Sequence, residues 1–268
     1  MKPDLKLACI LAHPDDESMG TGGLLAKYAA EGIGTSVITA TDGQQGWFGD
    51  PAEHPGFDAL AEIRARELRA SCAVLGVDRL ERLGFQDGNL QQVDRWEVIK
   101  PIVGCLRSER PQVVVTFGPF GIYGHPDHIA ISQLALASVL TAADPAHLPE
   151  AGEPHRVDKV YYFADTHETL DLYQQAFGEL VMQIDGEPRV PVGWPTWALS
   201  TRVDTSRYVD TVWEAIQCHE SQLPNIQKLS ELSSEDRRRL WSEARLYPVL
   251  NLTAADQRAE TDLFEGLR

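Results

Sequence analysis

Short apolar runs that alternate with helical segments constrain the fold of this 268-residue chain most strongly. Residues 6–12 and 112–118 are almost continuously apolar, as strands buried on both faces of a parallel sheet are. Residues 35–41 and 79–85 have the composition of further strands. Helical segments separate these runs, so the order β-α-β-α-β-α-β predicts a mostly parallel sheet with right-handed crossovers.

The helical segments of the first half are residues 22–31, 58–75 and 94–106, the last with a kink expected at Pro101. The second half is less regular: it predicts helices at 129–140, 207–222 and 234–246, and strands at 159–163 and 199–203. Composition does not change enough along the chain to mark a boundary. We therefore expect one α/β domain over residues 1–268, a Rossmann-like sheet flanked by helices.

The charge balance limits the classes of partner. The chain has 24 Lys and Arg against 40 Asp and Glu, a formal net charge of −16. A surface this acidic repels phosphate backbones and anionic lipid headgroups, so nucleic acid and membrane surfaces are not expected partners. A small neutral or cationic substrate, or a metal cation, is compatible with it.

Cysteine usage and the N-terminal residues bear on the compartment. The four cysteines are scattered without a C-x-x-C pair, so they predict no disulfide framework: Cys9, Cys72, Cys105 and Cys218. The first apolar run meets three acids after a few residues, which fits neither a signal peptide nor a membrane span. The expected location is the cytoplasm.

Two unusual polar clusters follow predicted strands. His13-Pro14-Asp15-Asp16-Glu17-Ser18 follows the first strand, and His125-Pro126-Asp127-His128 follows the strand at 112–118. Ligands of open parallel sheets bind outside the carboxyl ends of the strands, where both clusters would meet. Two histidines and two carboxylates there would build a three-ligand metal site with an open position, as in a hydrolytic centre. Taken singly, each cluster could instead be turn or helix-cap chemistry.

These motifs resemble those of the PIG-L/LmbE family of zinc-dependent N-acetylglucosaminyl deacetylases. The resemblance rests on AHPDDES at 12–18, the Gly-rich turn after it, and GHPDH at 124–128. It extends through Thr41-Asp42-Gly43, through the R-x-x-E pattern of Arg64 and Glu67, and through CHESQ at 218–222. Residues from about 140 to 195 carry no signature of this family.

The resemblance implies roles for the two main motifs. His13, Asp16 and His128 would ligate Zn²⁺, although a His₂Asp set also accepts Fe²⁺, Co²⁺ or Mn²⁺. Asp15 would be the general base that takes a proton from the attacking water. His125 would be the acid or cation that stabilises the oxyanion and helps the amine depart.

Five further residues have a functional interpretation and a structural alternative. Asp127 would orient His125, or cap the helix that follows. Arg64 would contact sugar hydroxyls, or form a surface pair with Glu67. His219 would lie near the site on a helix, or be a structural histidine. Substrate contacts are also predicted for two loop residues, Asp87, whose alternative is ordinary turn chemistry, and Trp47, which would stack on a sugar face.

The function predicted is a zinc-dependent hydrolase that removes the acetyl group from an N-acetyl amino sugar or glycoconjugate. Its partner would be a small N-acetylated sugar conjugate, and homo-oligomerisation stays open. One alternative is an amidase acting on thiol conjugates or other N-acyl substrates. Another is a non-catalytic sugar or nucleotide binder, which the metal content of the purified protein would distinguish from the enzymes.

Overall fold

A seven-stranded mixed sheet organises the computed structural model, which describes residues 4–184, 186–253 and 259–268. The strand order is β3-β2-β1-β4-β5-β9-β8; the first five strands are parallel and the last two run antiparallel to their neighbours. In chain order the strands of this sheet are β1 (Lys6–Leu11), β2 (Gly34–Thr41), β3 (Arg79–Phe85), β4 (Val113–Phe117), β5 (Lys159–Phe163), β8 (Thr201–Asp204) and β9 (Glu243–Asn251).

The chain changes direction across the sheet between β1 and β4. From β1 it moves outward through β2 to β3, and it then returns to place β4 on the other side of β1. β1 and β4 are in parallel register, with Leu7 opposite Val113 and Cys9 opposite Val115. A switch point of this kind leaves a crevice outside the carboxyl ends of the two strands. Both polar motifs begin at that crevice.

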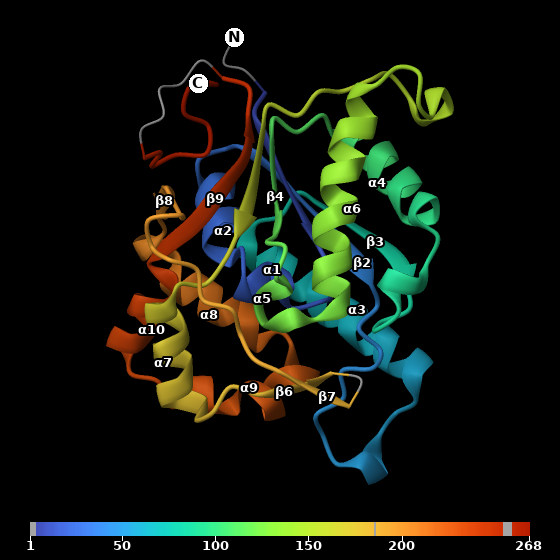
Figure 1. The fold of residues 1–268 in the computed structure, drawn as a ribbon. Helices are drawn as coiled ribbons and strands as arrows, with labels where there is room; N and C mark the ends of the chain where they lie inside the picture. The colour runs from blue at the N-terminus through green and yellow to red at the C-terminus, as the bar shows by residue number, and fades with distance from the viewer. Residues whose placement is uncertain (1–3, 185, 254–258) are drawn as a thin grey trace.

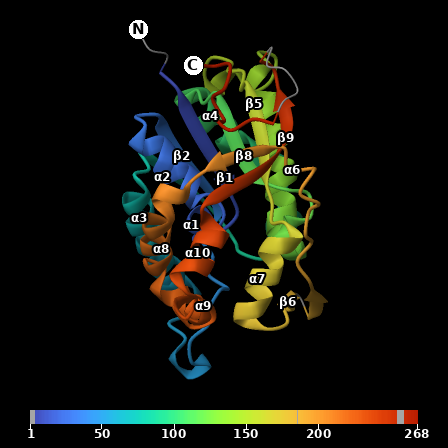
Figure 2. The same cartoon turned by 90° about the vertical axis from the view of Figure 1, so that its left-hand side faces the viewer.

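Helices cover both faces of the sheet. On one face lie α2 (Gly22–Ala30), α3 (Phe57–Leu75) and α8 (Val209–Gln217); on the other lie α4 (Arg95–Glu109) and α6 (Pro126–Ala143), as Figures 1 and 2 show. The side chains of β1 and β4 are buried almost throughout, because helices pack on both sides of them. The predicted α/β class, a mostly parallel sheet flanked by helices, is confirmed.

Short elements gather outside the carboxyl ends of the parallel strands. α1 (Asp16–Met19) and α5 (Gly121–Gly124) follow β1 and β4, and 3₁₀ turns lie at Pro51–Glu53, Leu90–Gln92, Ser206–Tyr208 and Glu220–Gln222. In Figures 1 and 2 the same end of the sheet is surrounded by α7 (His167–Phe177), α9 (Leu223–Ser230), α10 (Ser234–Trp241) and the hairpin of β6 (Met182–Ile184) and β7 (Glu187–Arg189). A further 3₁₀ turn, Pro149–Ala151, lies at the opposite edge of the sheet, before β5 (Figure 1).

The second half departs from the sequence prediction in several places, and α7, β6, β7 and α9 are not predicted at all. The helix predicted at 234–246 ends at Trp241, and β9 begins at Glu243, so the last five residues of that prediction are wrong. β9 is recruited by long-range pairing with β5 and β8, which local periodicity does not encode. The helix predicted at 207–222 is broken after Gln217, where His219 leaves helical geometry with ψ 64°.

The boundaries of the first half agree more closely. α6 starts at Pro126, three residues before the predicted helix, so Asp127 and His128 belong to its first turn. α4 runs through Pro101 as one helix. Among the described residues, none of the helices combines the length and apolarity that a membrane span needs.

A buried ion pair holds the C-terminal segment against the sheet. The Lys159 ammonium lies 2.7 Å from Glu260, and the Lys159 side chain is fully buried. Glu260 also accepts hydrogen bonds from Tyr161 (2.6 Å), Thr201 (3.2 Å) and Asn251 (3.1 Å). These contacts join β5, β8 and β9 to Glu260, which lies in the segment after β9. The network therefore stabilises the antiparallel edge of the sheet.

Replacing Lys159 tests this interpretation. Lys159→Met removes the counter-charge of Glu260 and should lower the free energy of unfolding by about 3–5 kcal/mol, because one buried charge is left unpaired. Lys27→Met is the control: Lys27 pairs with Glu31 on the surface of α2 at 3.0 Å, and its loss should cost under about 1 kcal/mol. Equal effects of the two substitutions in urea denaturation would contradict a stabilising role for the network.

Candidate active site

His13, the first residue of the first motif to reach the crevice, lies between two groups of polar side chains. Its Nε2 atom lies 3.0 Å from Asp87 Oδ1 and 3.3 Å from Asp127 Oδ2. Its Nδ1 atom lies 3.1 Å from His128 Nε2 and 3.8 Å from Asp16 Oδ2. The two carboxylates on the Nε2 side fix the ring, so a neutral His13 carries its proton there and presents Nδ1 to Asp16 and His128.

His128 and Asp16 are anchored in the same way. His128 Nδ1 lies 3.3 Å from the Gly121 carbonyl, and its ring stacks on Phe117 at 4.0 Å. Asp16 Oδ2 accepts hydrogen bonds from the backbone N–H groups of Ala12 (3.1 Å) and His13 (2.7 Å). The remaining atoms, His128 Nε2 and Asp16 Oδ1, are 3.5 Å apart. Each histidine thus has one anchored nitrogen and one nitrogen toward the cluster, whereas Asp16 faces His13 with its anchored Oδ2 and His128 with its Oδ1.

This arrangement fits a divalent cation. The facing atoms are separated by 3.1–3.8 Å, and the edge of a tetrahedral zinc site with bonds of about 2.0–2.1 Å is about 3.3 Å. All three residues are buried, with exposed fractions of 7% for His13, 8% for Asp16 and 3% for His128. Buried imidazole and carboxylate groups with hydrogen-bonded second nitrogens are the usual form of such a site.

The electrostatics of the three groups also favour a cation. Burial opposes a charge on His13, but hydrogen bonds and the charges of Asp127, Asp87 and Asp16 raise its pKa to about 10. Burial raises the pKa of Asp16 to about 7, although the charge of His13 opposes the shift. Burial and the neighbouring rings of His13 and His125 lower the pKa of His128 well below its ordinary value. The cluster therefore stabilises positive charge at His13 and keeps His128 neutral, the form that binds a metal.

Asp15 is directed away from these atoms by an unusual backbone. Its φ of 114° is rare for a non-glycine residue, and it places the side chain on the other side of the turn from Asp16. The Asp15 N–H donates to Glu17 Oε2 at 2.9 Å, and Asp15 Oδ2 accepts from Arg64 at 3.0 Å. The Asp15 side chain is 29% exposed, against 10% for Asp16. Burial nevertheless raises the pKa of Asp15, against the opposing charge of Arg64.

The structure places Arg64 and Asp87 beneath the site instead of at its mouth. Arg64 is 3% exposed and donates to the carbonyls of Pro14 and Gly43 as well as to Asp15. Its guanidinium therefore braces the motif turn, and no surface pair with Glu67 is formed. Asp87 contacts His13; despite burial, the His13 hydrogen bond and charge lower its pKa to about 2. Neither residue lines the cavity described below.

His125 caps the N-terminus of α6, whereas the Asp127 carboxylate contacts His13. His125 Nδ1 accepts from the Asp127 N–H at 3.2 Å, so its neutral ring carries a proton on Nε2. The ring contacts His13 edge-on at 4.6 Å and stacks on His128 at 4.8 Å. The Asp127 carboxylate accepts from the N–H groups of Gly88 (2.7 Å) and Leu90 (2.9 Å) and contacts His13. The predicted partner of this carboxylate was His125; the structure places it on His13.

His219 lies in a turn and not on the predicted helix. Its Nε2 is 2.7 Å from Glu17 Oε1, which also accepts from Ser71 at 2.5 Å, and both His219 and Glu17 are buried. Despite the cost of burial, the Glu17 charge and hydrogen bond raise the pKa of His219. Because Glu17 accepts the Asp15 N–H, this pair supports the strained turn from below. The roles of Glu17 and Ser71 are not predicted from the sequence, because Glu17 contacts Ser71 and His219, which are distant from it in the chain.

The rest of the C-terminal motif joins two other parts of the site. Ser221 donates its N–H and hydroxyl to Glu67 on α3, at 2.8 and 2.7 Å. Gln222 donates to the Gly46 carbonyl in the loop after β2 at 2.8 Å. Trp47, in the same loop, donates to the Asp50 carbonyl and packs on His54 with ring centroids 5.7 Å apart. Trp47 does not line the cavity, and its contact with a sugar stays a prediction.

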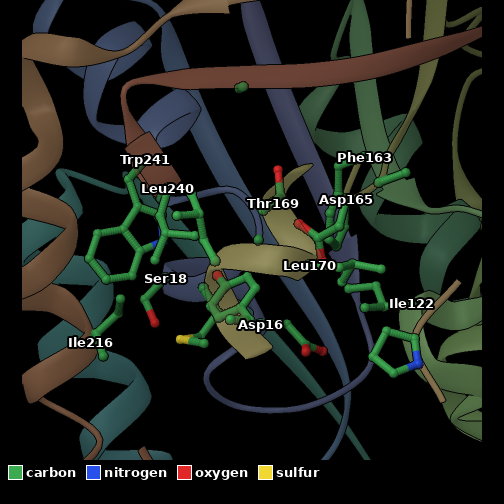
Figure 3. Close-up of a pocket in the computed structure, with 18 of the residues that line it drawn as sticks. Asp16, Ser18, Ile122, Phe163, Asp165, Thr169, Leu170, Ile216, Leu240 and Trp241 are labelled. Carbon is green, nitrogen blue, oxygen red and sulfur yellow. The ribbon is translucent and has the colours of Figure 1, made fainter. Parts of the chain in front are cut away.

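A cavity of about 1260 Å³ opens beside the metal-ligand cluster. Asp15, Asp16, His128 and His219 line one end of it. Figure 3 shows how it continues to side chains of α7, α8 and α10 and of the loop after β5: Asp165, Leu170, Ile216, Leu240 and Trp241. Its size exceeds that of a site for one monosaccharide, so a substrate with a second group attached has room.

Comparisons with known proteins agree with the geometry. The family model described as PIG-L: GlcNAc-PI de-N-acetylase matches residues 8–139. The 1D-myo-inositol 2-acetamido-2-deoxy-alpha-D-glucopyranoside deacetylase of Streptomyces avermitilis is 31% identical over 293 residues, which covers 99% of this chain and 98% of the relative.

Solved structures share the fold over most of its length. The conserved protein TT1542 from Thermus thermophilus is 27% identical, with a TM-score of 0.66 over 94% of this chain and 97% of that one. The N,N'-diacetylchitobiose deacetylase from Pyrococcus horikoshii has the same TM-score at 22% identity, over 92% and 85% of the two chains. The latter likeness concerns the fold alone.

The chain belongs to the PIG-L family. The predicted family, fold class and enzyme class, that of an N-deacetylase, are confirmed. The family is metal-dependent, and among the described residues two sets of side chains around His13 lie close enough together to hold an ion: His13, His125 and His128, and His13, Asp87 and Asp127.

Asp127 allows a test of the arrangement around His13. Asp127→Asn keeps the shape of the side chain but weakens its hold on His13 Nε2. Metal affinity should fall by about 10–100-fold, the usual effect of losing an outer partner of a ligating histidine. Asp144→Asn is the matched control, because Asp144 contacts only the exposed His147 among histidines. Metal titration of the two apo-proteins gives the answer; unchanged affinity in Asp127→Asn would contradict the proposed hold on His13.

Proposed function

We propose that this protein is a metal-dependent N-deacetylase that hydrolyses the acetamido group of an N-acetylglucosamine conjugate. One observation carries the proposal: ring nitrogens and carboxylate oxygens of His13, Asp16 and His128 face one another at 3.1–3.8 Å, and Asp15 stands on the same turn without joining them. The substrate class follows from the relatives, whose name specifies an acetamido sugar linked to inositol.

His13, Asp16 and His128 would hold a divalent cation, which would act as a Lewis acid on the amide carbonyl and lower the pKa of water. Asp15 then takes a proton from the attacking water. Its carboxylate is placed for this by Arg64, which leaves one oxygen to the cavity while binding the other at 3.0 Å. The strained backbone keeps Asp15 separate from Asp16, so that two neighbouring carboxylates have different tasks.

His125 acts on the other side of the cluster. Its Nε2–H can donate to the carbonyl oxygen as negative charge develops there, and a protonated ring can pass its proton to the departing amine. Asp127 serves the reaction indirectly by fixing His13. In this proposal Arg64 and Asp87 are positioning residues, because both are buried against the motif and not directed at substrate.

We extend the proposal to three finer points. Zinc is the ion we expect, since two histidines and one carboxylate with an open position are typical of catalytic zinc, although Fe²⁺, Co²⁺ and Mn²⁺ suit the same donors. Residues 1–268 act as one unit, because β9 completes the sheet and α10 closes the cavity. The partner is a small sugar conjugate in the cytoplasm.

Substitutions of the two adjacent carboxylates, Asp15 and Asp16, distinguish metal binding from proton transfer. Asp16→Asn replaces a charged ligand and should lower metal affinity by about 10-fold or more. Asp15→Asn should keep its metal and lose about 10²–10⁴-fold in kcat, the usual contribution of a positioned general base. Metal stoichiometry and turnover on an N-acetylglucosamine glycoside are measured on both folded variants.

Each variant is the control for the other, since the same change is made one residue apart. Loss of metal in Asp15→Asn with retention in Asp16→Asn would exchange the two roles. Full metal and full activity in both would refute the mechanism.

A further inference from the structure

Asp165 is a carboxylate of the cavity that the hydrolytic machinery does not use. It follows β5, the strand beside β4, and therefore lies at the same edge of the sheet as the metal ligands. Figure 3 shows it among the side chains that line the cavity, together with Asp16. It belongs to neither motif of the sequence analysis.

The backbone around Asp165 is fixed on both sides. Its carbonyl accepts the Trp194 N–H at 2.9 Å, and Thr166 pairs with Trp194 in an isolated bridge. The Thr166 hydroxyl caps α7 by accepting the Thr169 N–H, and Arg245 donates to the same hydroxyl at 3.2 Å. The backbone position of Asp165 is thus fixed by contacts with Trp194 and with the start of α7.

The carboxylate itself is left without a partner. Within the described ranges, Asp165 has no side-chain hydrogen bond and no ion pair, and burial alone raises its pKa to about 6. The side chain is only partly buried and lines the cavity, so its carboxylate is open to a bound group. A partly desolvated carboxylate accepts strong hydrogen bonds from a charged donor.

The arginines that line the cavity are already engaged. Arg245 pairs with Glu168 at 3.1 Å and with Glu243 at 2.6 Å, and Arg239 pairs within α10. Further carboxylates line the cavity at Glu179 and Glu231. The potential at this end is therefore negative, which favours a cation over a neutral or anionic group.

Apolar side chains complete the surroundings. Leu170, Leu172, Leu240 and Trp241 line the cavity between α7 and α10. They provide a surface for the carbon chain that carries a charged end group, and they strengthen a charge-assisted hydrogen bond by excluding water.

We propose that Asp165 is a specificity residue for a primary ammonium group on the aglycone of the substrate. The inference rests on the proposed deacetylase function and names a substrate class for it: N-acetylglucosamine conjugates whose second moiety carries an amine on a short apolar linker. The ammonium group donates to the Asp165 carboxylate while the acetamido group lies at the metal end of the cavity. The bond cleaved is the acetamide, as in the parent reaction.

Matched substrates test the proposal. N-acetylglucosamine glycosides with 2-aminoethyl and 4-aminobutyl aglycones are compared with their hydroxyl counterparts. For whichever of the two amino glycosides reacts faster, the wild-type kcat/KM should exceed that of its hydroxyl counterpart by about 10-fold or more. This is the ratio expected for a hydrogen bond to a charged group. Asp165→Asn should reduce that preference to about 2-fold or less, and Asp165→Ser provides a second variant without the charge.

Glu168→Gln is the control, since it removes a carboxylate of the same cavity that already has Arg245 as partner. It should keep the amine preference. Wild-type enzyme that hydrolyses amine and hydroxyl glycosides equally would overturn the role of Asp165 and leave the proposed function intact.

The failure of the deacetylase function has a different signature. If the wild type hydrolyses none of the glycosides, the same pairs are compared by calorimetric binding. A preference for the amines that Asp165→Asn removes then supports the subsite, and equal binding refutes it. Loss of metal in the Asp165 variants would also contradict the proposal, because it would place Asp165 in the machinery of the metal site.

Discussion

The position of His13 between two pairs of polar side chains is the contact on which the site depends. Asp87 and Asp127 hold one ring nitrogen, so the other faces His128 and Asp16. Without the two carboxylates, the ring could present either nitrogen to the crevice. The negative charge of Asp87 and Asp127 also favours a cation at the point where His13, Asp16 and His128 converge.

The fold supplies these contacts by placing two strand ends side by side. His13 and Asp16 follow the end of β1, and His128 lies in the first turn of α6, which follows β4 and α5. The strained turn at Asp15 then separates two adjacent carboxylates: Asp16 contacts the two ligand histidines, and Asp15 contacts Arg64. Arg64 and the Glu17–His219 pair hold this turn from beneath, at contacts drawn from α3 and from the C-terminal motif.

The sequence predicts some of these features and cannot predict others. The apolar runs and the two motifs suffice to place His13, Asp16 and His128 at one edge of a parallel sheet. They do not show that Arg64 is buried, because its partners are a carbonyl and a carboxylate some 50 residues away. β9 is missed for a similar reason: its pairing with β5 is antiparallel and spans most of the second half. Local periodicity contains no information on such partners.

The metal-loaded protein provides the most direct test of the account. A crystal structure with anomalous scattering from the bound ion locates it relative to both sides of the His13 ring. The account predicts an ion about 2.0–2.2 Å from His13 Nδ1, His128 Nε2 and Asp16 Oδ1, with Asp87 and Asp127 still on Nε2. An ion bound instead to His13 Nε2, Asp87 and Asp127, which also lie close enough to hold one, would contradict it.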